Sequence, residues 1–321
     1  MLQQTQVKTV IPYWERWMRE LPSIRALAKA RPQKVLKLWE GLGYYTRARN
    51  LHKAARVVME QHGGCFPPAF DEVLALPGIG RYTAGAICSI AYNRPAPIVD
   101  GNIIRVLTRL FGIRENPRER KTQDRLWELA GSLVESASQL PATRDGNCSH
   151  LNQSMMELGA LICTPRAPKC NVCPVRRVCV ARAERCAEEL PNLGVRQRQT
   201  DRHFIALVLQ DENRFLVQQR PANVVNAHLW EFPNLEMAKP TRDSTTFTAR
   251  QIGFTIKSPE LLCTIKHSIT RYRITVQAFR ANWSRTPKRK LPRSHWLTLA
   301  QMHKLPFTSA HKKILGHLTD G

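Results

Sequence analysis

Four of the nine cysteines gather in one short segment of the sequence and could hold a metal centre. Their spacing is Cys163-x6-Cys170-x2-Cys173-x5-Cys179, which lets four thiolates wrap around one centre. Structural zinc sites more often pair two Cys-x2-Cys knuckles across a longer spacer, and this segment has only one such pair. A cubane iron–sulfur cluster takes one thiolate per iron and accepts irregular spacing. The spacing therefore favours a 4Fe-4S cluster, with a zinc site or unligated thiols as the alternatives, and it leaves Cys186 outside the pattern.

A tight turn, Leu76-Pro77-Gly78-Ile79-Gly80, stands before an expected helix that begins at Arg81. Two glycines around one apolar residue let a phosphate approach the backbone, and the N–H groups at the start of the following helix can hold that anion. The same turn could also serve only to connect two helices. Between two helical segments of a strongly basic chain, we favour a helix-hairpin-helix clamp for a DNA backbone, shaped by Gly78 and Gly80.

A carboxylate follows twenty residues past Gly80, as Asp100 in the segment PIVDGN, just before the helical stretch Ile103–Phe111. Aspartate fills the N-cap position of a helix readily, and Asp100 by itself is best explained in that way. A carboxylate fixed at a helix start can also stabilise an oxocarbenium-like cation or activate water. Position alone leaves this second role open.

The charge of the chain indicates a polyanionic partner. Its 321 residues carry 49 Lys and Arg against 25 Asp and Glu, a formal net charge of +24 with a pI near 10.3. Nucleic acid is the commonest partner for such an excess, although a generally basic surface is the alternative. No apolar run approaches the ~20 residues that a membrane-spanning helix needs, and the first residues, MLQQTQVKTV, contain no apolar signal segment. Clustered cysteines in a chain without a signal suggest a metal or redox site rather than disulfides.

Two kinds of element must position these residues. Residues 1–186 read as short helices separated by Gly- and Pro-marked turns, beginning with an apolar stripe on one helix face at Val7, Val10, Ile11, Trp14, Met18 and Leu21. Residues 187–200 read as a polar linker. Beyond it the pattern predicts strands at His203–Leu209, Phe215–Val217 and Arg271–Phe279, and a final helix, Ala310–Leu318, capped by Ser309. We therefore expect an all-α domain at 1–186 and a smaller α+β domain at 201–321.

Together these residues resemble the iron–sulfur DNA glycosylases of the endonuclease III type. Members of the endonuclease III branch attack the sugar with a lysine of the hairpin helix, and Tyr82 stands at that place here. In this the chain is similar to the adenine glycosylases, the MutY family. Three segments, Met1–Val7, Gly41–Asn50 and Met155–Cys163, match that family almost verbatim, and residues 201–321 look like its Nudix-related domain, which reads an oxidised guanine.

The resemblance implies a monofunctional glycosylase that hydrolyses the N-glycosidic bond of adenine mispaired with 8-oxoguanine or guanine, in base excision repair. It assigns Asp100 to the developing sugar cation, with Tyr82 and Asn102 beside it. The resemblance also implies DNA contacts by two sets of residues. The residues that wedge into the base stack are Leu2, Gln3, Gln4, Thr5 and Tyr44. The residues of the phosphate-binding hairpin are Gly78 and Gly80. The resemblance further implies a 4Fe-4S cluster on Cys163, Cys170, Cys173 and Cys179. The expected partner is double-stranded DNA with 8-oxoguanine:adenine or guanine:adenine mismatches, bound by a monomer that is cytoplasmic and nucleoid-associated if bacterial.

Two departures from the family pattern carry expectations of their own. The family's adenine-protonating glutamate would stand two residues before Met1, so we expect either a start placed at an internal methionine or a binder that cannot excise, and favour the first. Upstream codons for Glu-Val would support it. The loop that probes 8-oxoguanine often reads Phe-Ser-His, whereas Ile269-Thr270-Arg271 stands here. We expect Arg271 to donate hydrogen bonds to the lesion or to a phosphate. A bifunctional glycosylase/lyase and a DNA-binding module without catalysis are the competing functions.

Overall fold

The computed structural model describes residues 1–3, 5–141, 146–194, 199–238, 243–269, 271–285 and 293–319. Its internal contacts divide the chain into two units: Met1–Met59 together with Gln197–Gly321 (unit 1), and Glu60–Arg196 (unit 2). The first helices therefore group with the C-terminal residues, and the division falls inside one helix, α4 (Thr46–Gln61). The predicted linker at 187–200 stays a prediction, because residues 195–198 lie outside the described residues.

Unit 1 begins with helices around a core of their own. They are α1 (Val7–Glu20), α2 (Ile24–Lys29), α3 (Pro32–Trp39) and α4 (Thr46–Gln61). Trp17 and Trp39 meet edge to face at the centre of this core, with ring centroids 5.7 Å apart. The side chain of Ser23 caps α2 by accepting from the Ala26 N–H, and Pro32 starts α3, where its missing N–H costs nothing.

The predicted apolar stripe of α1 is only partly a core face. Val10 and Leu21 are buried, and they are joined by Trp17, but the other members of the stripe are exposed: Val7, Ile11, Trp14 and Met18. The apolar residues of α1 occupy more of its circumference than α3 and α4 cover. Periodicity showed that α1 is amphipathic, but it did not show which side of a wide apolar arc faces the core.

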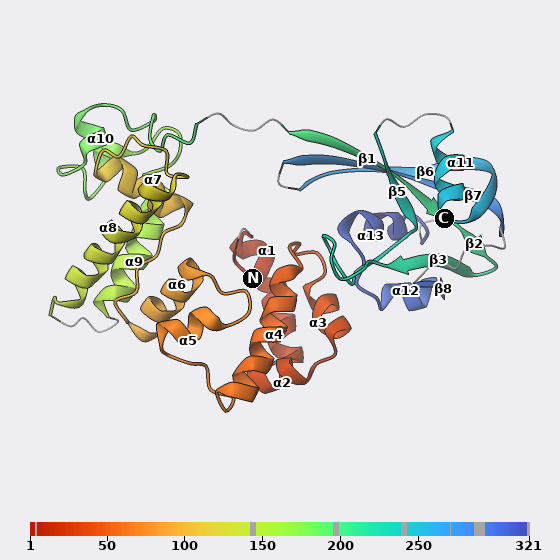
Figure 1. Ribbon diagram of the computed structural model, residues 1–321, viewed down its shortest axis with the longest axis horizontal. Coiled ribbons are helices and arrows are strands. Elements are labelled where there is room, and N and C mark those ends of the chain that lie inside the picture. Colours follow the sequence, from red (N-terminus) through yellow and green to blue (C-terminus); the bar gives the residue numbers. More distant parts are fainter. Residues whose placement is uncertain are drawn as a thin grey trace. The chain divides into compact units, whose positions relative to one another are not determined.

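Unit 2 is helical, as the sequence predicts. Its elements are α5 (Phe70–Ala75), α6 (Arg81–Tyr92), α7 (Gly101–Leu110), α8 (Arg120–Ser138), α9 (Asn147–Glu157), the π-helical turn η1 (Leu158–Ile162), the 3-10 turn η2 (Cys170–Val172) and α10 (Val180–Ala183). The main core of the unit packs α7 against α8, with Ile103, Leu107 and Leu126 almost fully buried. Figure 1 draws these elements in orange to green.

The C-terminal part of unit 1 is built on two sheets. One has the strand order β5-β1-β7-β6, in which β1 runs parallel to β7 and the other pairs are antiparallel; the second joins β2, β3 and β4, with β8 on the free edge of β3. The strands are β1 (Thr200–Val208), β2 (Gln210–Asp211), β3 (Arg214–Gln219), β4 (Trp230–Glu231), β5 (Asn234–Met237), β6 (Phe254–Ile269), β7 (Tyr272–Arg285) and β8 (Ser294–Thr298). The sequence predicted β1, β3 and β7 and missed the long strand β6.

Helices cover both faces of the first sheet (Figure 1). Ile205 and Leu207 pack on the side of α11 (Ser244–Gln251), whereas Ala206 and Val208 pack on the side of α13 (Ser309–Gly316) and α12 (Leu299–His303). This double burial explains why β1 reads as a continuous apolar run instead of an alternating one.

The cap of the final helix differs from its prediction. Thr308 occupies the N-cap position of α13, and Ser309 is already the first helical residue. The Ser309 side chain instead forms a hydrogen bond with the hydroxyl of Tyr45, the residue just before α4 in the same unit. The Ser309 hydroxyl therefore makes a tertiary hydrogen bond rather than a helix cap. Among the residues that the structure describes, no helix is long and apolar enough to cross a membrane.

Candidate functional site

The glycine-rich turn between α5 and α6 has the predicted hairpin conformation. Gly78 has φ +81°, a left-handed conformation that residues with a side chain rarely adopt, and the Ile79 N–H closes the turn on the Leu76 carbonyl at 3.1 Å. Gly80 is extended and occupies the N-cap position of α6, so this helix begins directly after the turn. The geometry is that of a tight helix–hairpin–helix. Binding of a phosphate there stays a prediction.

Asp100 caps α7, as the simpler interpretation predicted. Its Oδ1 accepts a hydrogen bond of 2.8 Å from the N–H of Ile103. This bond fixes the carboxylate at the positive end of the helix dipole, where a negative charge is stabilised. Its half-buried position leaves the second carboxylate oxygen for another partner. The cap and a catalytic role are compatible, because capping uses only one of the two oxygens.

Tyr82 lies on the first turn of α6 and faces the same region as Asp100. Its hydroxyl donates to the sulfur of Met156 at 3.6 Å, and its ring packs against the α7–α8 core. Burial, and then the negative charge of Asp100, raise the pKa of the Tyr82 hydroxyl. Tyr82 is therefore a neutral group beside the carboxylate, and the fold brings together two predicted residues that are distant in sequence.

Asn102, the third predicted catalytic residue, is hydrogen-bonded to the side chain of Arg105. Its Oδ1 accepts from Arg105 Nη2 at 2.9 Å, and the same nitrogen donates to the carbonyl of Gly159 at 2.6 Å. Nε of Arg105 donates to the carbonyl of Cys163 at 2.7 Å. Gly159 packs so closely on Asn102 that an added Cβ would lie 2.7 Å from the Asn102 Cβ. One guanidinium thus connects the start of α7 with the first cysteine of the loop.

A second arginine of α7 holds the cysteine loop one turn further on. Nη1 of Arg109 donates to the sulfur of Cys163 at 3.3 Å and to the carbonyl of Thr164 at 2.7 Å, while Nε donates to the carbonyl of Leu190 at 2.9 Å. The side chain is almost fully buried. Because α7 carries Asp100 at its start and both arginines further along, one helix positions the carboxylate and the cysteine segment.

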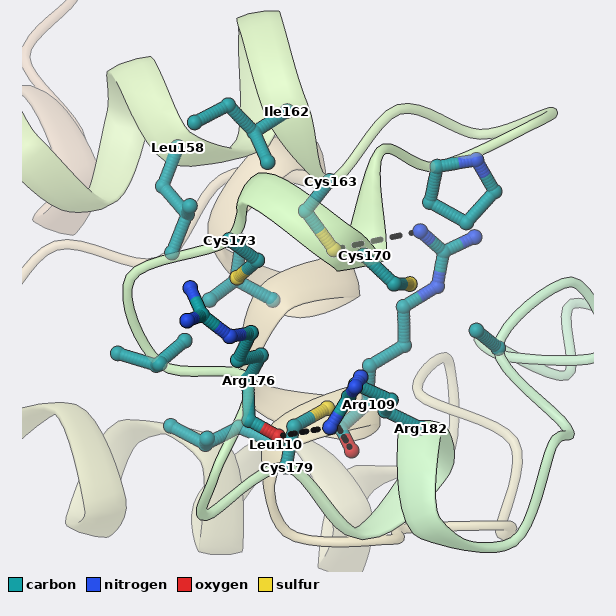
Figure 2. A pocket seen from close by; sticks show the side chains of 14 residues that line it. Arg109, Leu110, Leu158, Ile162, Cys163, Cys170, Cys173, Arg176, Cys179 and Arg182 are labelled. Carbon is teal, nitrogen blue, oxygen red and sulfur yellow. Dashed lines mark hydrogen bonds between the residues drawn. The ribbon is translucent and has the colours of Figure 1, made fainter.

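The four predicted cysteines line one pocket. Figure 2 shows them around the same space, together with Arg109, Arg176 and Arg182. Burial, followed by the negative charges of its three neighbours Cys163, Cys179 and Cys173, raises the pKa of the Cys170 thiol. Cys186 does not line this pocket and is buried beside Ala181 and Leu190.

The four cysteines can be compared with the ligand needs of a single ion and of a polynuclear cluster, and the identity of the centre stays a prediction. Over the described parts of the chain, no three His, Cys, Asp or Glu side chains converge closely enough to hold one metal ion. A tetrahedral zinc site needs its four sulfurs within about 2.3 Å of one point, whereas a cubane spreads its ligands over four irons. All four cysteines are free of disulfides and partly accessible, so a cluster has the ligands that it needs.

The predicted DNA-wedge residues lie in unit 1. Leu2 and Gln3 are exposed, Thr5 is half-buried, and Gln4 lies outside the described residues. Tyr44 is 48% exposed and has φ +45°, uncommon for a residue with a side chain. Arg47 brings these two segments together, because its guanidinium donates to the carbonyls of Met1, Gln3, Leu42 and Gly43 and stacks on the ring of Tyr44.

Arg271 lies at the turn between β6 and β7. Its Nη2 donates to the hydroxyl of Tyr272 at 3.0 Å, and its guanidinium stacks on the same ring. The side chain is exposed, and its neighbour Thr270 lies outside the described residues. A role of Arg271 in lesion recognition stays a prediction.

Sequence reasoning missed the arginines that position these sites: Arg47, Arg105 and Arg109. A signal existed for the last two. Asn102, Arg105 and Arg109 recur at three- and four-residue spacing, so they share a face of α7, and an arginine on the buried side of a helix requires several acceptors. No comparable pattern pointed to Arg47, whose acceptors are backbone carbonyls of two separate segments.

Comparisons with known proteins agree with this architecture. Residues 1–132 match the HhH-GPD superfamily of base excision DNA repair proteins, and residues 204–317 match the NUDIX domain, so both predicted domain types are confirmed. The adenine DNA glycosylase of Rattus norvegicus is 34% identical over 365 residues, covering 98% of this chain and 69% of the relative. That of Buchnera aphidicola subsp. Acyrthosiphon pisum is 36% identical over 236 residues, covering 74% of this chain and 65% of the relative.

A solved structure, a thermostable thymine-DNA glycosylase, is 30% identical with a TM-score of 0.49, covering 57% of this chain and 80% of that one. The chain spans about two thirds of the length of the curated relatives named above.

Proposed function

Because the chain belongs to the adenine DNA glycosylase family, we propose that it removes adenine mispaired with 8-oxoguanine or guanine from double-stranded DNA. The reaction is hydrolysis of the N-glycosidic bond without strand cleavage. The observation that carries this proposal is the carboxylate of Asp100, which the Ile103 N–H fixes at the start of α7, with Tyr82 packed on the core that α7 and α8 share. A lysine at position 82 would instead favour a covalent sugar intermediate.

The target adenine must first leave the base stack, because an enzyme cannot reach a glycosidic bond inside a duplex; extrusion costs a few kcal/mol. The bond between the sugar carbon and the base nitrogen then breaks, and its electron pair leaves with the adenine. Positive charge develops on the sugar, and the oriented carboxylate of Asp100 stabilises it. Water adds to the sugar carbon and gives up a proton, the departing adenine takes up a proton on the nitrogen that held the sugar, and the products are an abasic site and neutral adenine. We assign the orientation of the sugar or the water to Asn102, whose Oδ1 accepts a hydrogen bond from Arg105.

The four cysteines that line the pocket beside Arg109 would hold a 4Fe-4S cluster. When bound, the cluster supplies a rigid cross-link of the loop 163–179 rather than a reacting group. This loop presents exposed cations, Arg166, Lys169 and Arg176, which we propose contact DNA phosphates. A broad absorbance shoulder at about 400 nm in purified protein would support the cluster, and its absence would favour zinc. Retained DNA binding in a cluster-free Cys170→Ser variant would contradict this role of the loop.

We assign the remaining DNA contacts to the residues that the sequence analysis predicted for them. The hairpin at Gly78 and Gly80 holds a phosphate at the start of α6, and Tyr44 with the segment of Leu2, Gln3, Gln4 and Thr5 wedges into the stack beside the oxidised guanine. Arg271 reaches the lesion or a neighbouring phosphate. The C-terminal domain acts in recognition only: Glu231 is buried against Arg220, and Glu236 pairs with Arg202. Metal-dependent hydrolysis of 8-oxo-dGTP would contradict that assignment.

The test compares duplexes that carry adenine opposite 8-oxoguanine, guanine or thymine. We expect release of adenine from the first two, alkali-dependent strand breaks only, and no borohydride-trapped adduct. A trapped adduct would instead indicate a lyase that acts through a protein amine. Binding to the 8-oxoguanine:adenine duplex without any adenine release would identify a lesion-binding protein and refute the proposed excision.

A further inference from the structure

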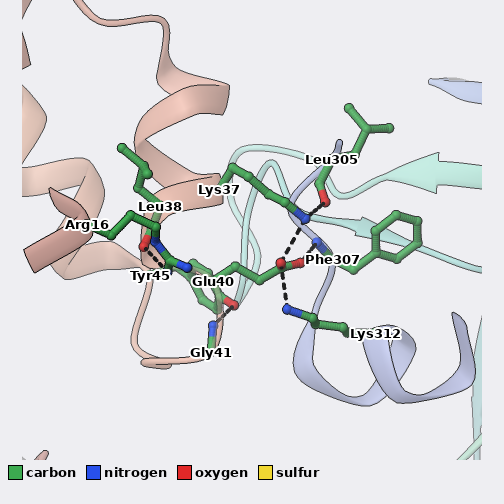
Figure 3. Close-up of polar contacts among 9 residues, drawn as sticks. All are labelled: Arg16, Lys37, Leu38, Glu40, Gly41, Tyr45, Leu305, Phe307 and Lys312. Carbon is green, nitrogen blue, oxygen red and sulfur yellow. Dashed lines mark hydrogen bonds and ion pairs between the residues drawn. The ribbon is translucent and has the colours of Figure 1, made fainter. Parts of the chain in front are cut away.

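Glu40 is a buried carboxylate with partners in both the N-terminal helices and the C-terminal domain of unit 1. Its side chain is only 5% exposed. Oε2 receives Lys37 Nζ at 2.8 Å and Lys312 Nζ at 2.8 Å, and Oε1 accepts from the Phe307 N–H at 2.9 Å (Figure 3). Lys37 also donates to the carbonyl of Leu305 at 2.9 Å.

This carboxylate is charged despite its burial. Burial alone would raise the pKa of Glu40, but the hydrogen bonds from Lys312, Lys37 and the Phe307 N–H outweigh that effect, and the pKa is lowered. A buried carboxylate with donors at both oxygens makes stronger and more directional bonds than an exposed ion pair. Glu40 therefore attaches the end of α3 firmly to the segment 305–312.

The residues after Glu40 form the loop Gly41–Tyr44, and the residue that closes this loop is attached to the same segment. Tyr45 is 2% exposed, and its hydroxyl accepts from the Gly41 N–H at 3.2 Å and forms a hydrogen bond with Ser309. Only four residues separate the two attachments, so the loop has little freedom to move. Tyr44 projects from it into solvent.

Further contacts extend the attachment along α4. Nη1 of Arg49 donates to the carbonyl of Ala227 at 3.0 Å, and Leu229 is fully buried in the core of the N-terminal helices. Both partners belong to the loop between β3 and β4. The C-terminal domain thus contacts α3, α4 and the residues on each side of the Tyr44 loop.

We propose that Glu40 is a positioning residue that fixes the exposed Tyr44 loop to the C-terminal domain, so that base-stack insertion and lesion reading act as one rigid unit. The DNA part of this inference rests on the proposed function. Glu40 itself lies too deep to contact DNA, and it acts through the loop that it anchors. Loss of the anchor should therefore weaken lesion binding only as far as Tyr44 contributes to it.

The first experiment measures the attachment without DNA. Hydrogen exchange of the full chain is compared between the wild type, Glu40→Gln and Lys312→Met. Glu40→Gln keeps the shape and the acceptor for the Phe307 N–H but loses the charge that holds both lysines. We expect the amides of Gly41–Arg47 to exchange about tenfold faster in both variants. Glu20→Gln is the matched control, since it breaks an exposed pair with Lys34 in the same helices. Unchanged exchange of the loop in Glu40→Gln would overturn the inference.

The second experiment is a double-mutant cycle on lesion preference. The preference is the ratio of the Kd for undamaged duplex to the Kd for 8-oxoguanine opposite a non-hydrolysable adenosine analogue. Tyr44→Ala should lower it about tenfold, as expected when one stacked aromatic is lost, and Glu40→Gln about threefold or more. In the Tyr44→Ala background, Glu40→Gln should cause no further loss.

A merely structural role would give independent, multiplying effects, so equal losses in the two backgrounds would overturn the inference. If Glu40→Gln fails to fold, Lys312→Met carries the same cycle, because its half-exposed side chain can be truncated without a buried cavity. A wild type without lesion preference would refute the proposed function, and the exchange experiment would still decide the attachment.

Discussion

Substitutions of Asp100 separate its observed role as a helix cap from its proposed role as the catalytic carboxylate. Asparagine at this position keeps an oxygen that can accept the Ile103 N–H, now at 2.8 Å, but removes the charge. Alanine removes both. If Asp100 were only a cap, Asp100→Asn would be harmless, whereas a catalytic carboxylate makes it as inactive as Asp100→Ala.

The magnitudes follow from the single hydrogen bond and the single charge. Asparagine and aspartate are equivalent N-caps, so Asp100→Asn should leave stability unchanged, whereas Asp100→Ala should lose about 1 kcal/mol. For a unit of this size that loss lowers the melting temperature by about 3 °C. Removing the charge that faces the developing cation should slow excision at least about a hundredfold in both variants.

The assay pairs thermal melting with single-turnover adenine release from the 8-oxoguanine:adenine duplex, and adds a binding measurement for the same lesion. Asp124→Asn is the control, because it makes the same chemical change at an exposed position of α8. Lesion binding should survive in Asp100→Asn. Full excision by that variant would refute the catalytic role, and a melting temperature as low as that of Asp100→Ala would refute the cap argument.

Three further predictions concern the side chains that support these sites. His311 is fully buried, its Nδ1 accepts from the Phe232 N–H, and burial lowers its pKa from 6.5 to about 4. The folded state therefore holds the His311 imidazole neutral. The stability that His311 contributes is present above pH 6.5, and about 3 kcal/mol of it is lost as the pH falls towards 4. Urea unfolding should show this loss for the wild type and not for His311→Asn. Arg105→Lys leaves buried carbonyls without donors, and unfolding measurements should show a loss of about 2–4 kcal/mol, with slower excision; unchanged stability and rate would contradict the bridge from Asn102 to Cys163. Arg47→Met should release Met1–Gln3 from the Tyr44 loop, and limited proteolysis should then cleave the first residues faster than in Arg19→Met, which changes an exposed arginine on α1.

Much of the site was readable from the sequence because its residues are local. Cys163 to Cys179 lie within one loop, Gly78 needs its positive φ for a turn of five residues, and Asp100 caps the helix that follows it. Each of these depends on neighbours a few positions away, and their side-chain types already restrict the chemistry. The strand β6 was missed for the opposite reason: its pattern is interrupted by bulges, and its pairing with β7 supplies the regularity that its own residues lack.

The sequence by itself determined which chemical groups are available: four thiols in one loop, a carboxylate at a helix start, a tight glycine turn and a large excess of basic residues. Only the tertiary structure decided which polar side chains hold those groups in place. Arg105, Arg109, Arg47 and Glu40 are ordinary surface types in the sequence, but each is partly or fully buried among acceptors or donors from distant segments. A buried charged group makes strong hydrogen bonds in fixed directions because the interior has a low dielectric constant and its partners are held in place. These partners come from distant segments, so no local sequence pattern identifies them.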